Sequence, residues 1–136
     1  MNKTDKKLNK YEKALQKQVE ELMLAEKVKF TVFLPVLRSD LPLDTTSKEY
    51  RSKHRSEYLK HRRATYTVDE IIRMLDVLGY KLQFRYDKIE ISVVPEILQD
   101  TRLKYVDMMI TCKLLNIKIE WQKSSIEGAK NTKGNS

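Results

Sequence analysis

Apolar residues recur every three or four positions at the start of the chain and predict a helix over about residues 6–26. The residues that carry this period are Leu8, Tyr11, Leu15, Val19 and Leu22. The period then changes to two, because residues 28, 30, 32 and 34 are apolar and their neighbours are mostly polar. This alternation is typical of a strand, which we expect to end at Pro35 and to be followed by a loop.

Thr67 marks the clearest helix start in the sequence. Thr67 and Glu70 have the Thr-x-x-Glu spacing of a capping box, in which the hydroxyl and the carboxylate each accept a backbone N–H. Gly79 lies where a left-handed residue would end that helix. Thr46 and Glu49 have the same spacing as the first pair and predict a second helix over residues 47–63.

Two strands, a helix and a last strand are predicted beyond Gly79. Alternating patterns indicate strands over residues 82–86 and 89–93, with a hairpin turn at Asp87 and Lys88. A helix is expected over about residues 99–115, before Asn116 and a strand over residues 117–121. The residues expected on its inner face are Leu103, Val106, Ile110 and Leu114.

From residue 28 onward the predicted order is βααββαβ, so the fold class is α+β. This order is that of a ferredoxin-like split βαβ fold with an antiparallel sheet, here preceded by an extra N-terminal helix. The predicted register places Lys29, Arg85, Glu90 and Lys118 on one face of the sheet. It places Phe30, Phe84, Ile91 and Ile119 on the opposite face.

The domain organisation expected from these patterns has three parts. Residues 1–26 form an amphipathic helix that packs on the core or links to it, residues 27–122 form a single α+β domain, and residues 123–136 form a flexible basic tail. Leu8, Leu15 and Leu22 keep heptad spacing, so the first helix either offers a homodimer contact or docks on its own domain.

Residues 65–80 carry one resemblance. The stretch from Thr65 to Tyr80, with its capped start and Leu-Gly end, resembles the closing helix of lambda-repressor-type helix-turn-helix domains. A strand is predicted upstream, where such domains have their first helices. The resemblance therefore transfers no functional residue to this chain.

The charge of the chain is concentrated in one predicted helix. The 136 residues include 27 Lys and Arg against 19 Asp and Glu, a formal net charge of +8. Residues 47–63 hold seven of the basic and only two of the acidic residues. Arg binds phosphate through two N–H groups, and aromatic rings can pack on sugars and bases. The candidate nucleic-acid-binding residues are Lys48, Arg51, Lys53, Arg55, Tyr58, Lys60, Arg62 and Arg63.

We therefore expect a cytoplasmic, non-catalytic nucleic-acid-binding protein, with DNA favoured over RNA. The alternative is a protein-interaction module, such as an inhibitor or adaptor, whose basic helix docks on an acidic protein or a nucleoprotein surface. The same charges are also compatible with a helix that is merely solvated. A third possible function is that of an enzyme, which would need a cleft that gathers acidic residues from separate elements.

No residue group in the sequence indicates catalysis, a cofactor or a metal. His54 and His61 are seven residues apart on one helix, or about 10 Å, too far to share an ion. Cys112 has no nearby histidine in the sequence and is expected to be buried. A membrane partner is not expected, since no apolar run reaches about 18 residues.

Overall fold

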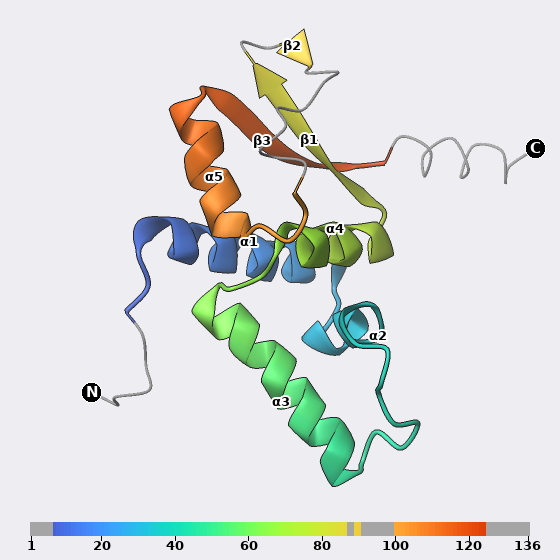
Figure 1. Ribbon diagram of the computed structural model, residues 1–136. Coiled ribbons are helices and arrows are strands. Elements are labelled where there is room, and N and C mark those ends of the chain that lie inside the picture. The colour runs from blue at the N-terminus through green and yellow to red at the C-terminus, as the bar shows by residue number, and fades with distance from the viewer. Residues whose placement is uncertain (1–6, 87–88, 91–99, 125–136) are drawn as a thin grey trace, which may run out of the picture.

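The protein folds into an α+β structure in which helices lie against one small antiparallel sheet (Figure 1). The structure, a computed structural model, describes residues 7–86, 89–90 and 100–124. The helices are α1 (Lys10–Glu26), the 3-10 helix η1 (Phe30–Phe33), α2 (Leu34–Leu37), α3 (Lys48–Arg63), α4 (Val68–Val77) and α5 (Tyr105–Leu114). The strands are β1 (Tyr80–Tyr86), β2 (Ile89–Glu90) and β3 (Ile117–Lys123).

The strand predicted over residues 28–34 is wrong, because residues 30–34 belong to the helices η1 and α2 and residues 28–29 pair with no strand of the described chain. Phe30, Phe33 and Leu34 are all buried and have the i, i+3, i+4 spacing of a helix. Four alternating residues are too few to distinguish the two periods. Pro35 lies in the first turn of α2, where a missing N–H does no harm.

The sheet has the order β2-β1-β3, and both neighbours of β1 are antiparallel to it. The predicted register of its main pair is confirmed, since Phe84 lies opposite Ile119 and Arg85 lies opposite Lys118. Lys29 and Phe30 do not belong to the sheet. The ferredoxin-like arrangement is not found among the described residues, because its first strand is replaced by η1 and α2. The predicted turn at residues 87–88, the strand beyond residue 90 including Ile91, the side chain of Glu90 and the tail after residue 124 lie outside what the structure describes.

The fold contains the same helix–strand unit twice, and equivalent residues of the two units are 37 positions apart in the sequence. The first unit consists of α4 and β1, and the second of α5 and β3; in both, a ten-residue helix leads into a seven-residue strand. A residue with positive φ joins helix and strand in each unit, Gly79 (φ 79°) in the first and Asn116 (φ 59°) in the second. Both breaks were predicted from the sequence.

The two units are related by an approximate twofold axis. The backbone N–H of Val68 donates to the carbonyl of Leu103, and the N–H of Tyr105 donates to the carbonyl of Tyr66. Val68 is equivalent to Tyr105, and Tyr66 is equivalent to Leu103, so the two hydrogen bonds join equivalent pairs of residues. The β1–β3 pairing obeys the same symmetry, since Gln83 lies opposite Glu120, its own equivalent.

The core lies between the two helix–strand units, α1 and η1. Leu15, Val19 and Leu22 of α1 are buried in it, so the apolar stripe of this helix packs within its own chain. The stripe therefore docks on its own domain, which is one of the two alternatives that the heptad spacing allowed.

The predicted inner face of the last helix is partly wrong. Leu114 is 78% exposed, and the residues that α5 buries are Tyr105, Val106, Met108 and Cys112. The helix starts at Tyr105, several residues later than expected. Residues spaced by four rotate by about 40° at each step, so Leu114 lies about 80° around the helix from the buried Val106 and leaves the core face.

Candidate nucleic-acid interface

The basic helix α3 projects away from the sheet and is fixed at both ends by its own sequence (Figure 1). The hydroxyl of Ser47 accepts the backbone N–H of Tyr50 and caps the N-terminus, whereas Ala64 in the left-handed region ends the helix. The predicted capping box at Thr46 is wrong, because the Thr46 hydroxyl donates instead to Asp44 in the preceding loop. Basic residues gather in the last turn, where the helix dipole favours positive charge.

The face of α3 that packs on the body of the protein is polar. Its two buried residues are Glu57 (2% exposed) and His61 (1% exposed), one helical turn apart. The His61 ring packs among Phe30, Tyr58 and Tyr66, with ring centres 5.6–6.0 Å apart. Since both fully buried residues are polar and the other contact of this face with the core includes the partly buried Tyr50, polar contacts contribute strongly to the orientation of this helix.

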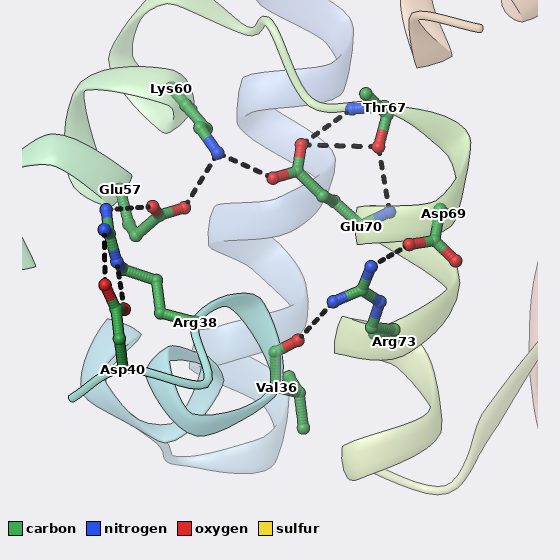
Figure 2. A network of polar contacts seen from close by, with 9 residues as sticks. All are labelled: Val36, Arg38, Asp40, Glu57, Lys60, Thr67, Asp69, Glu70 and Arg73. Atoms are coloured by element: carbon green, nitrogen blue, oxygen red, sulfur yellow. Dashed lines mark hydrogen bonds and ion pairs between the residues drawn. The ribbon is translucent and has the colours of Figure 1, made fainter. Parts of the chain in front are cut away.

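Glu57 is the centre of an ion-pair network that joins α3 to the segment after α2 and to α4 (Figure 2). Its carboxylate lies 3.1 Å from the Arg38 guanidinium and 3.0 Å from the Lys60 ammonium. Arg38 also binds Asp40 through two N–H groups, and Lys60 reaches Glu70 at 2.8 Å. Glu70 is the capping-box residue of α4, so the network connects the basic helix directly to the start of the first helix–strand unit.

These contacts change the pKa values of the groups involved. Hydrogen bonds from Arg38 and then Lys53 hold the pKa of Asp40 well below its usual range. Burial lowers the pKa of Lys60, but the hydrogen bonds to Glu70 and Glu57 outweigh it and leave that pKa raised. The hydrogen bond to Asp40 raises the pKa of Lys53. All the basic groups in the network therefore keep their charge near neutral pH.

Lys53 and Lys60, both predicted phosphate contacts, are thus placed differently from the prediction. The Lys53 ammonium lies 2.7 Å from Asp40 and 3.4 Å from Glu49, and its side chain is only 18% exposed. Lys60 is held between Glu57 and Glu70. Glu49 and Glu57 lie on α3 itself, four and three residues before their lysines, whereas Asp40 comes from the loop before α3 and Glu70 from α4. The residues of the helix alone could not reveal the pairs with Asp40 and Glu70.

The opposite face of α3 carries cations that no acidic group of the described chain neutralises. Lys48, Arg51 and Arg55 are exposed and form no ion pair with a described residue. Together with Ser52 they line a shallow hollow of about 260 Å³ on the N-terminal half of the helix. The spacing i, i+3, i+4, i+7 places all four side chains on one stripe. We call these four residues the cationic hollow.

Ser52 is the residue of the hollow that the charge pattern missed. A hydroxyl between guanidinium groups adds a neutral donor to an anion site. Its position one turn after Lys48 and one residue after Arg51 was the only signal available in the sequence.

The remaining predicted residues flank the hollow on the C-terminal half of α3. Arg62 and Arg63 are exposed, and the Arg62 carbonyl accepts a hydrogen bond from Gln16 on α1. Tyr58 is 39% exposed but packs edge-on against Phe30, with ring centres 5.2 Å apart. Its ring is therefore fixed and offers one edge to a partner.

Other reactive residues of the described chain do not assemble into a site. Within the described ranges no three His, Cys, Asp or Glu side chains come together in a way that would hold a metal ion. His54 packs against Phe30 and Tyr58. Cys112 is buried, as predicted, and burial raises the pKa of its thiol to about 11.

The comparisons with known proteins give no match: no family model, no curated protein and no solved structure is similar to this chain. Among the described helices, none has the length and apolar character needed to cross a membrane.

Proposed function

We propose that the protein is a non-catalytic, cytoplasmic nucleic-acid-binding protein that uses the exposed face of α3 to contact phosphates, with duplex DNA favoured over RNA. The observation that carries this proposal is the cationic hollow, in which Lys48, Arg51 and Arg55 surround Ser52 and form no ion pair with any residue that the structure describes. Like charges held this close repel one another, and an anion relieves that repulsion. A phosphodiester is the anion whose repeated charges fit a stripe of cations.

The division of α3 into two faces supports the same proposal. The buried face is fixed by Glu57, Lys60 and His61, so the helix is held rigidly on the body of the protein. The cations of the outer face are therefore preorganised for a partner, and binding loses less entropy than it would for a flexible basic segment.

Fluorescence anisotropy with labelled nucleic acids tests the proposal. Duplex DNA, duplex RNA and both single strands are titrated with the protein at several salt concentrations. Contacts from the hollow together with Arg62 and Arg63 should give a slope of about −4 for log Kobs against log salt on duplex DNA. Absence of binding to all four nucleic acids at low salt would reject the proposal.

One observation favours a second candidate, a module that docks on an acidic protein surface. Leu59 is 36% exposed beside Tyr58, so the C-terminal half of the outer face offers an apolar contact between cations. Apolar anchors surrounded by charge are typical of protein interfaces. In that case affinity should fall on Leu59→Ala, whereas phosphate binding through the hollow should not change.

A further inference from the structure

The outer edge of β3 pairs with no other strand of the described residues. In the order β2-β1-β3, β3 lies at one end of the sheet, and the structure pairs it on that side with no strand of the described ranges. The equivalent edge of β1 does carry a strand, since β2 pairs there at Tyr86↔Ile89. The 37-residue equivalence maps Arg85 and Tyr86, the two β1 residues that pair with β2, onto Gln122 and Lys123, so the last part of the β3 edge corresponds to the part of β1 that carries a strand. An edge of this kind presents unpaired N–H and C=O groups.

The charges on β3 complement a second copy of the same strand. Across a twofold axis that passes through Ile119, an antiparallel copy places Lys118 opposite Glu120 twice, once on each side of the axis. The apolar face then continues across the junction, because Ile119 meets Ile119 and Ile117 meets Trp121 of the other copy. Opposite charges and apolar pairs at directly opposed positions stabilise antiparallel strands.

The neighbouring registers are excluded by the same residues. A shift that centres the axis on Glu120 opposes two glutamates, and one that centres it on Lys118 opposes two lysines. A slip by a single residue would place polar side chains opposite apolar ones. The alternation of Lys118 and Glu120 therefore selects one register, whereas lysines alone would only discourage pairing.

The two side chains are available for such contacts. Lys118 is exposed and forms no ion pair with a described residue. Glu120 binds Arg85 and Gln122 through one carboxylate oxygen only, Oε1, while its Oε2 has no partner among the described residues. That oxygen can accept a hydrogen bond from the Lys118 ammonium of a second copy, while Oε1 keeps its hydrogen bonds from Arg85 and Gln122.

We propose that two copies of this chain associate through β3, in the register that opposes Lys118 and Glu120, and form one continuous sheet. This inference is independent of nucleic-acid binding. The axis runs perpendicular to the sheet, so the helices of both copies lie on the same side of it. The pairing buries only one strand edge per copy, so the dimer is weak and forms at high protein concentration.

Sedimentation velocity of the full chain, from about 1 µM to about 1 mM, tests the proposal without any nucleic acid. The wild type should shift from monomer to dimer within this range. In the Lys118→Glu variant, residues 118 and 120 of each copy are both glutamates, so four carboxylates meet at the junction. The dissociation constant of the dimer should then rise about tenfold. Within its own chain the new carboxylate would lie opposite Arg85, so the fold is not at risk. The combined exchange Lys118→Glu with Glu120→Lys restores opposite charges and should restore the dimer.

Lys13→Glu on the exposed face of α1 is the matched control, because it changes the net charge by the same amount away from β3. Circular dichroism establishes that each variant is folded. A monomeric wild type at all concentrations would overturn the proposal, as would an equal effect of Lys13→Glu or a failure of the double exchange to recover the dimer.

Discussion

His61 of α3 and Glu20 of α1 lie side by side, with 2.9 Å between the imidazole Nε2 and the carboxylate Oε2. The imidazole is 1% exposed and the carboxylate 54%, so the pair bridges the core and the solvent. The second ring nitrogen, Nδ1, has no hydrogen-bond partner among the described residues. The pair thus joins α3 to α1 but leaves one buried polar atom unsatisfied.

This arrangement predicts that His61→Phe is tolerated. The phenyl ring keeps the packing against Phe30 and Tyr66, removes the unsatisfied nitrogen and leaves Glu20 free to be hydrated. Urea denaturation should show a free energy of unfolding within about 1 kcal/mol of wild type. His61→Ala, which removes the ring, should cost at least about 2 kcal/mol. If both variants are equally destabilised, the hydrogen bond to Glu20 and not the ring holds the helix.

Glu57→Gln should be strongly destabilising, in contrast to His61→Phe. It removes a carboxylate that is 2% exposed and leaves Arg38 and Lys60 without their shared partner. Loss of one member of a buried ion pair costs about 3 kcal/mol. Glu49→Gln on the same helix is the control, because that carboxylate is 64% exposed and should contribute less than about 0.5 kcal/mol.

Thr67→Ala should lower the free energy of unfolding by about 1 kcal/mol. The Thr67 hydroxyl accepts the backbone N–H of Glu70 at 3.1 Å, and the variant leaves that N–H without its acceptor. Thermal denaturation followed by circular dichroism measures the effect. An unchanged midpoint would mean that solvent replaces the cap at no cost.

Lys48, Arg51 and Arg55 replaced together by Gln should weaken nucleic-acid binding and flatten the salt slope by about three units. The three side chains are exposed, so circular dichroism should not change.

The matched control replaces the exposed lysines Lys13, Lys17 and Lys113 by Gln and removes the same charge from α1 and α5. Its salt slope should stay close to that of the wild type. If the two triple variants bind equally weakly, the hollow contributes only to the overall charge of the protein.

The thiol of Cys112 should react slowly in the folded protein. Its side chain is 1% exposed, and burial raises its pKa to about 11, so at pH 8 almost none of it is thiolate. A chromogenic disulfide reagent should label it rapidly only after urea is added. Rapid labelling of the native protein would show that α5 opens locally.

Several features that depend on residues close together in the sequence were predicted correctly. Thr67 and Glu70 form the predicted capping box, and Gly79 and Asn116 end their helices with positive φ. A cap depends on residues within one turn, so its sequence pattern is informative. The pattern alone is not sufficient, because Thr46 and Glu49 have the same spacing but Ser47 caps α3 instead. The same holds for the alternation of β1 and β3.

Features that depend on tertiary contacts could not be predicted. Phe30 and Leu34 fit the alternation of a strand, whereas Phe30, Phe33 and Leu34 together fit the spacing of a helix. Only their contacts in the core decide between the two structures. The cations of α3 look alike in sequence, but distant acids such as Asp40 and Glu70 occupy Lys53 and Lys60.

The repeated unit was also hidden in the sequence. Leu78 and Leu115 are identical, as are Lys81 and Lys118, whereas the other equivalent positions of the described units agree only in kind or not at all. Equivalent residues share burial more than identity: Ile71 matches Met108, and Leu75 matches Cys112, all four being buried. A core requires volume and apolar character, which many residue types supply.

The two units differ in how their helices begin. The first keeps a full capping box, and its Glu70 also holds the basic helix through Lys60. At the equivalent positions the second has Lys104 and Asp107, and its helix has no side-chain cap at all. In a symmetric homodimer a lost cap would weaken both halves at once. Within one chain the two helix starts are encoded by separate residues, so a change at Thr67 or Glu70 affects the start of α4 and leaves the residues that begin α5 unchanged.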